Sequence, residues 1–332
     1  MTIEKRSEAA AEHRHPGIFG VNLLYLICLT LFVTVGYYVQ RVHIYKGLLI
    51  TQFGLILLPS LLFILFTNKN FRYTLRLNRL KWSYLPILFG ISIAVYGVAI
   101  YLSLLWSMVL DAFGELIPSP LPPINTAWDY LKNILIVAGA AGLCEEVLFR
   151  GVMLRGYERL SIKKAIVVTS LLFGLMHVNI QNFIGPVILG FVIGYAVYRT
   201  NSILAGMVIH FLNNAISLTF AYIGTLLNNM SGGMADEFNT LSDFPADMKT
   251  MAVIVWTVIG LVCFAVMMLL LNILKKRTQG QAKQQMPYSA ADKEKTNFLH
   301  YLPLVFAGVL AGVNLVLQIM VITGVMPVVP TV

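Results

Sequence analysis

Long apolar runs, repeated along the whole chain, constrain this sequence of 332 residues more than any other feature. A helix needs roughly 20 mostly apolar residues to cross the hydrocarbon core of a bilayer, which is about 30 Å thick. The sequence therefore predicts an all-α fold, a polytopic transmembrane helix bundle of about nine spans, in which the short fifth and sixth spans form a hairpin. The predicted spans are residues 18–40, 47–67, 85–109, 130–154, 165–180, 182–198, 202–223, 251–274 and 298–326.

The composition agrees with a membrane protein. The chain is 58% hydrophobic and only 12% charged, whereas soluble domains average about 25% charged residues. A soluble globular protein is therefore excluded. Cys28, Cys144 and Cys263 all lie in apolar runs and show no CxxC spacing, which indicates neither a disulfide framework nor a zinc ribbon.

The positions of the basic residues predict the orientation of the bundle. The chain carries 24 Lys and Arg against 15 Asp and Glu. With the spans above, 19 basic residues fall on one side of the membrane and four on the other. Basic residues accumulate in cytoplasmic loops, so we predict a cytoplasmic N-terminus and an outer C-terminus. The net charge of +9 then reflects topology, and no nucleic acid partner is expected.

The N-terminal residues and the first basic loop are informative about the N-terminal spans. Residues 1–17 carry three acids and no small-residue cleavage site, so the first apolar run is predicted to be a retained span and not a signal peptide. Residues 71–82 alternate basic with apolar or aromatic residues and suit either an interfacial segment or a plain basic loop. We divide the chain into N-terminal spans with this segment (1–129), a core (130–223), and C-terminal spans with a polar linker (224–332).

Five ionisable side chains interrupt the apolar spans, all between residues 145 and 210. A charge inside a bilayer costs roughly 2.5–3.5 kcal/mol on insertion scales, so such residues usually face the protein interior. Any one of them could be a structural ion pair or a hydrogen-bonded imidazole, but five together indicate a site. They are Glu145, Glu146, Arg150, His177 and His210.

Helix geometry predicts which of these residues share a face. Positions four apart lie together, so Glu146 can pair with Arg150, while Glu145 projects about 100° away and stays free for chemistry. The same spacing joins Phe173 to His177 and His210 to Asn214. Polar faces of three spans can be satisfied only by one another or by trapped water, and a shared polar cavity follows.

Depth in the membrane is a second criterion for this cavity. Glu145 and His210 both lie roughly 12–15 Å from the cytoplasmic ends of their spans. His177 lies nearer 20 Å, at about 1.5 Å per residue. It joins the cluster only if its helix is tilted or if the turn after it dips into the protein. That turn contains Asn179, Gln181 and Asn182.

The set of side chains favours amide hydrolysis. A carboxylate in apolar surroundings can act as a general base at neutral pH, and imidazole and amide groups can stabilise an oxyanion. In the alternative, His177, His210 and Glu145 bind zinc and leave one position for water. The sequence has no HExxH motif, so no cofactor is favoured and zinc stays the alternative.

Three motifs resemble those of one known family. The segments Glu145-Glu146-Val-Leu-Phe-Arg150, Phe173-Gly-Leu-Met-His177 and His210-Phe-Leu-Asn-Asn214 resemble the EExxxR, FxxxH and HxxxN motifs of the CPBP intramembrane proteases. That family includes type II CAAX prenyl endopeptidases and bacteriocin-processing or bacteriocin-immunity proteins. All three motifs occur in order on separate predicted spans.

The resemblance implies a role for each motif residue. Glu145 would activate a water molecule with help from His177, while His210 and Asn214 would form the oxyanion hole. Glu146 and Arg150 would hold the active-site helix in place, and Phe173 would support the site as a packing aromatic. The expected activity is an endopeptidase, of glutamate or metallo type, acting near the cytoplasmic side on a hydrophobic peptide or membrane-protein substrate in the lipid bilayer.

Two other functions remain open from the sequence. One is a non-catalytic immunity or regulatory protein that binds a partner in the same cavity. The other is a proton-coupled carrier, but carriers often contain internal repeats, and none is found in this sequence. The expected location is the bacterial cytoplasmic membrane. In a eukaryote, the resemblance would instead imply removal of a C-terminal tripeptide after a prenylated cysteine.

Overall fold

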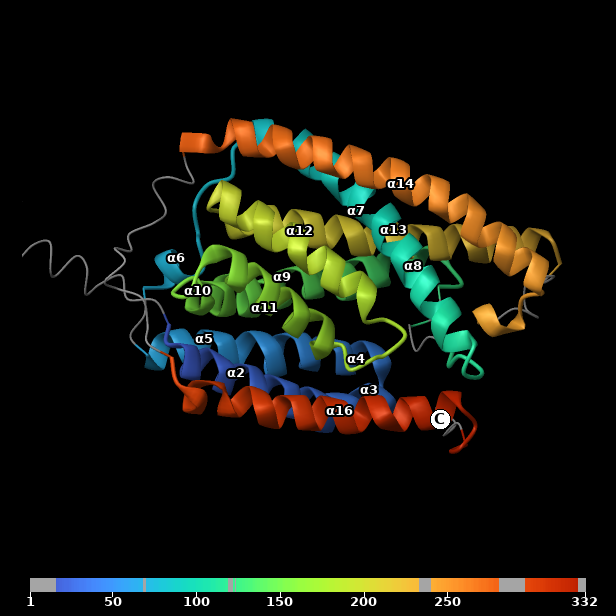
Figure 1. Ribbon diagram of the computed structural model, residues 1–332, viewed down its shortest axis with the longest axis horizontal. Coiled ribbons are helices and arrows are strands. Elements are labelled where there is room, and N and C mark those ends of the chain that lie inside the picture. Colours follow the sequence, from blue (N-terminus) through green and yellow to red (C-terminus); the bar gives the residue numbers. More distant parts are fainter. Residues whose placement is uncertain are drawn as a thin grey trace, which may run out of the picture.

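The computed structural model describes residues 16–67, 70–118, 122, 124–232, 240–280 and 296–327. All regular structure within these ranges is helical, which confirms the all-α prediction. The helices run roughly parallel or antiparallel to one long direction (Figure 1). Helix α14 (Ala246–Arg277) lies along one flank and α16 (Leu302–Ile322) along the opposite flank, with the central helices between them.

The N-terminal helices form a hairpin followed by one long helix. Helix α2 (Ile18–Leu31) continues through a π-helical turn at Phe32–Gly36 into α3 (Tyr37–Val42). The return arm consists of α4 (Ile44–Leu49), a π-helical segment at Ile50–Leu57 and α5 (Leu58–Phe66). The short α6 (Phe71–Thr74) and a 3-10 turn at Trp82–Tyr84 lead into α7 (Leu85–Asp111).

The motif-bearing region begins with one continuous helical run. It contains α8 (Ala127–Asn133), α9 (Ala141–Glu146) and α10 (Leu154–Tyr157), joined by π-helical segments at Ile134–Ala140 and Val147–Met153. A capping box between Thr126 and Asp129 starts this run. Then follow α11 (Ile162–Met176), α12 (Ile184–Thr200) and α13 (Ile203–Met230). Short 3-10 turns at Leu241–Asp243 and Phe298–Tyr301 precede α14 and α16.

The predicted number of about nine spans is not confirmed. Six helical segments in the described part of the chain are long and apolar enough to cross a membrane. The predicted hairpin of residues 165–180 and 182–198 corresponds to α11 and α12, which have 15 and 17 residues. Both are shorter than the roughly 20 residues that a span needs. The six segments are Ile18–Val42, Ile44–Phe66, Trp82–Asp111, Ile203–Met230, Ala246–Arg277 and Phe298–Ile322.

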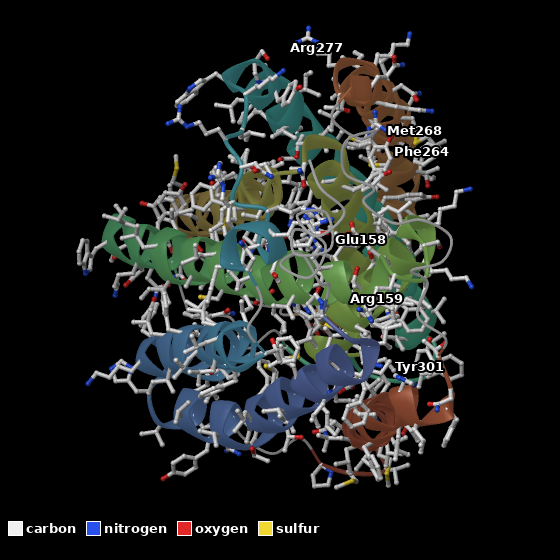
Figure 2. All side chains as sticks on the ribbon, turned by 90° about the vertical axis from the view of Figure 1, so that its left-hand side faces the viewer. Glu158, Arg159, Phe264, Met268, Arg277 and Tyr301 are labelled. Atoms are coloured by element: carbon white, nitrogen blue, oxygen red, sulfur yellow. The ribbon has the colours of Figure 1, made fainter. Side chains whose placement is uncertain are left out.

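Basic residues gather at one end of the bundle. This basic end is formed by residues 70–84, 155–164, 199–203, 275–280 and 296–301, which hydrogen bonds hold together, such as Asn78 Nδ2 to Asn201 O (2.8 Å). It carries twelve of the described Lys and Arg residues, against four at the opposite end, formed by residues 41–46, 111–118, 124–132, 178–183, 230–232 and 240–249. Figure 2 looks at the basic end, with Glu158 and Arg159 near its middle and Arg277 and Tyr301 toward its edges.

A buried arginine closes the basic end over the motif-bearing helix. Arg76 is fully buried and has a left-handed φ of 49°. Its Nη1 donates to the backbone oxygen of Arg150 (3.2 Å), and its Nη2 pairs with Glu158. Arg155 Nη1 bonds the other oxygen of Glu158 (3.0 Å). Burial lowers the pKa of Arg76 to about 10, so this guanidinium is charged at neutral pH. Arg76 therefore anchors residues 71–82 in the protein. This segment does not lie wholly on the membrane surface.

Candidate active site

A cavity of about 590 Å³ lies among the central helices. Glu145, His177, His210 and Asn214 all line it, so the structure brings together these four sequence-predicted site residues. Phe173 also lines it, whereas Glu146 and Arg150 lie buried behind it, with 0% and 1% of their surface exposed. The volume falls within the range of about 300–1,000 Å³ that is usual for ligand pockets.

Glu146 links three helices behind the cavity. Its Oε1 accepts hydrogen bonds from Arg150 Nη1 (3.1 Å) and from His210 Nδ1 (2.9 Å). Arg150 Nη2 also donates to the backbone oxygen of Gly190 on α12 (3.3 Å). The carboxylate therefore fixes the orientation of His210 on α13. A Cβ atom at Gly206 would lie 2.6 Å from Glu146 Oε2, so α13 needs glycine at this position to approach the carboxylate.

Glu145 faces the cavity and is held differently. Its Oε1 accepts a hydrogen bond from Gln52 Nε2 (2.7 Å), and its Oε2 lies 3.9 Å from His210 Nε2. Because His210 Nδ1 is directed at Glu146, the second ring nitrogen is the one presented to Glu145. A water molecule about 2.8 Å from both atoms fits this separation.

Phe173 packs between the two histidines. Its ring centroid lies 5.2 Å from that of His177 and 5.5 Å from that of His210, both edge to face. The guanidinium of Arg150 covers the same ring at 4.5 Å. His177 Nδ1 lies 2.9 Å from the backbone oxygen of Phe173. A carbonyl oxygen only accepts, so Nδ1 carries the proton and Nε2 is the acceptor of a neutral ring.

The turn after α11 brings His177 into the cluster. Val178 adopts φ 45°, an unfavourable conformation for a β-branched residue. Gln318 on α16 holds this turn, because its Oε1 accepts from Ile180 N (2.9 Å) and its Nε2 donates to Val178 O (2.6 Å). Trp106 Nε1 on α7 donates to Ile180 O (2.6 Å). The turn is thus folded against the protein, as the predicted depth of His177 required.

Several polar residues of the cavity were not predicted from the sequence, and Gln52 and Asn213 contact or adjoin the predicted site residues. Gln52 comes from the second helix, 93 residues before Glu145. Asn213 also lines the cavity, and its Nδ2 donates to Asn214 Oδ1 (3.4 Å). A search for ionisable residues in spans overlooks neutral amides, although an amide inside an apolar run is a similar signal.

The helices at the site depart from regular α geometry on both sides of the glutamates. The π-helical segments Ile134–Ala140 and Val147–Met153 flank α9, which carries Glu145 and Glu146. Gln52 itself lies in the π-helical segment Ile50–Leu57. π-helical turns occur frequently at functional sites. Here Gln52 lies within one such segment, and its partner Glu145 lies between two others.

The zinc alternative requires His177, His210 and Glu145 to surround one ion. Within the described ranges, no group of three His, Cys, Asp or Glu side chains is arranged to hold a metal. Zinc therefore stays an untested alternative, and the reaction proposed for this site uses the side chains alone.

The apolar helices and the polar site between them define an integral membrane protein with a carboxylate and two imidazoles around one cavity. Residues 127–216 match the family described as type II CAAX prenyl endopeptidase Rce1-like, which confirms the family resemblance of the three motifs. This segment is thus similar to intramembrane CAAX-type proteases and contains Glu145, His177, His210 and Asn214. No curated protein and no solved structure matches the chain.

Proposed function

We propose that this protein is an intramembrane endopeptidase that hydrolyses a peptide bond of a hydrophobic peptide or membrane protein, with Glu145 as general base. The observation that carries the proposal is the position of Glu145, whose Oε2 lies 3.9 Å from His210 Nε2 at the wall of an internal cavity. The family match of residues 127–216 supports the same class of reaction. We place the protein in a bacterial cytoplasmic membrane.

In the proposed reaction, Glu145 removes a proton from water as the water oxygen attacks the scissile carbonyl carbon. Gln52 fixes one carboxylate oxygen and leaves Oε2 for this proton transfer. His177 lines the same cavity, and its Nε2 can accept a hydrogen bond from the water. The C–N bond then breaks, and the proton taken from the water goes to the leaving amine.

The oxyanion of the tetrahedral intermediate is assigned to His210 and Asn214. Asn214 supplies its amide Nδ2 from the helical turn after His210. His210 already directs Nδ1 at Glu146, so it donates from Nε2 when the ring is protonated. Preorganised donors of this kind are a large component of catalysis.

The decisive comparison is between wild type, Glu145→Gln and a matched control, Glu115→Gln, in detergent. Glu115 is exposed and lies outside the cavity. Cleavage of a panel of quenched fluorescent hydrophobic peptides is measured with and without a metal chelator. General-base catalysis contributes about 10²–10⁴-fold, so we expect Glu145→Gln to lose at least about 100-fold in rate and Glu115→Gln to keep the wild-type rate.

Cleavage that is equal in wild type and Glu145→Gln contradicts the proposal. Loss of activity with chelator and its return with zinc would assign the water activation to a metal. If folded wild type cleaves no peptide of the panel but still binds peptides in the cavity, the non-catalytic immunity or regulatory function replaces the protease.

A further inference from the structure

We propose that the substrate reaches Glu145 from the non-cytoplasmic face of the membrane, and that it is an uncharged, apolar peptide segment exposed on that face. This inference rests on the proposed function for the reaction itself. The direction of access depends only on the position of the cavity and on the charge distribution, and it does not depend on the reaction. It differs from the sequence-based expectation of cleavage near the cytoplasmic side.

The cavity extends from Glu145 toward the end of the bundle opposite the basic end. In α7, which runs away from the basic end, the lining residues lie between Tyr96 and Ser107, in the second half of Leu85–Asp111. In the helical run 127–157, which runs toward the basic end, they lie between Ile136 and Glu145. Helices α11 and α12 contribute residues beside the turn that joins them at the opposite end, namely Phe173, His177, Asn182, Gly185, Pro186 and Leu189.

The outermost lining residues identify the mouth of the cavity. Gln40 lies two residues before the end of α3 at Val42, and Ser107 lies four residues before the end of α7 at Asp111. Asn182 precedes α12 and is exposed. All three positions are at the opposite end. The cavity therefore communicates with this membrane face.

The basic end is closed behind the catalytic residues. The rings of Phe149 and Phe173 pack edge to face at 5.0 Å and are both essentially buried. Behind them, the backbone oxygen of Arg150 accepts from the buried Arg76, which is itself paired with Glu158. A substrate arriving from the basic end would have to displace this ion pair and the aromatic layer.

The charge distribution assigns the two ends to membrane faces. Twelve described basic residues lie at the basic end and four at the opposite end, which makes the basic end cytoplasmic by the positive-inside rule. Access from the opposite end is then access from the non-cytoplasmic face.

The lining of the cavity indicates the chemistry of the segment that enters. Glu145 is the one acidic residue in the lining, which contains no Lys or Arg. Apolar side chains alternate with hydroxyls on one wall, where Ile100 and Leu104 neighbour Ser103 and Ser107 on α7. Such a wall suits apolar side chains, with hydroxyls available to peptide groups, and it offers no partner for charged side chains.

Cysteine accessibility tests the direction of access without depending on activity. Cys28 and Cys144 are fully buried, so Cys263→Ala gives a background without a partly accessible thiol. In this background, Ser103→Cys and, independently, Gln40→Cys place a thiol in the cavity. Lys163→Cys places one on the exposed start of α11 at the basic end. Each variant is treated with a charged, membrane-impermeant maleimide in right-side-out and inside-out membrane vesicles.

We expect both cavity thiols to react at least about tenfold faster in right-side-out vesicles, because a charged reagent does not cross the hydrocarbon. Lys163→Cys should show the reverse preference. The inference would be overturned if the cavity thiols were labelled faster in inside-out vesicles, or if they were labelled at equal rates in both kinds of vesicle. A fluorogenic apolar peptide supplied on one face of oriented proteoliposomes is the second measurement. If the peptide is not cleaved from either face but the labelling pattern is as expected, the result contradicts the proposed function and still supports the direction of access.

Discussion

Gln52 and Glu145 lie 93 residues apart in the sequence, yet Gln52 Nε2 donates to Glu145 Oε1 over 2.7 Å. The N-terminal hairpin therefore reaches directly into the cluster formed by the three motifs. Gln52 lies outside residues 127–216, which carry the family match. We infer that Gln52 is a positioning residue, since it holds one oxygen of the proposed base and leaves the other toward His210.

Gln52→Leu is expected to lower kcat. A hydrogen bond to a charged group contributes about 1.5–3 kcal/mol, which corresponds to roughly 10- to 100-fold in rate. Thr51→Val is the comparison, because the Thr51 hydroxyl donates to Gly47 O instead of the glutamate. Equal values of kcat for the two variants would contradict the positioning role.

Gly206→Ala should disrupt the site through packing. The added methyl group would lie 2.6 Å from Glu146 Oε2 and 2.8 Å from Val197 Cγ2. Overpacking of this kind costs about 1–3 kcal/mol, and it would push His210 away from Glu146. Gly224→Ala on the same helix is the matched control, since nothing lies within 4 Å of its added Cβ. Thermal unfolding in detergent should show a lower Tm for Gly206→Ala alone.

Gln318→Leu is expected to impair activity more than stability. It removes both hydrogen bonds that hold the turn at Val178 and Ile180, next to His177. Asn314→Leu, one helical turn earlier on α16, loses only a bond to its own helix at Leu310 O. Hydrogen exchange at the Ile180 amide should accelerate in Gln318→Leu and stay slow in Asn314→Leu. Slow exchange in both variants would show that Trp106 and the packing suffice to hold the turn.

The buried Arg76–Glu158 pair predicts a non-additive double mutant. Glu158→Gln leaves the guanidinium of Arg76 without its carboxylate, and breaking a buried ion pair from one side costs about 3–5 kcal/mol. Arg76→Met in the Glu158→Gln background removes the uncompensated charge and should recover part of the loss. Chemical unfolding of the single and double variants measures this coupling. Simple additivity would mean that the pair makes no specific contribution.

The sequence predicted the motif cluster because charged residues in apolar helices are few and their helical spacing is informative. The spacing of four residues places Glu146 beside Arg150, and the structure shows this ion pair at 3.1 Å. The division into regions 1–129, 130–223 and 224–332 and the catalytic roles stay predictions.

The parts that sequence reasoning missed depend on contacts between distant segments or on backbone geometry. Gln52 carries no charge and lies far from the motifs in the chain. The π-helical segments around Glu145 and Glu146 have no simple residue pattern. The predicted segments 165–180 and 182–198 have nearly the lengths of α11 and α12 but are displaced from them by a few residues, because an apolar run does not indicate where tertiary contacts such as those of Gln318 end a helix.

The closure of the basic end also constrains how the protein is made. Arg76 precedes its partners Arg150 and Glu158 by 74 and 82 residues. During synthesis, its guanidinium therefore stays hydrated at the membrane surface until the motif-bearing helix has emerged and inserted. Only then can the arginine enter the protein, so the basic end closes over the motif-bearing helix no earlier than the insertion of that helix.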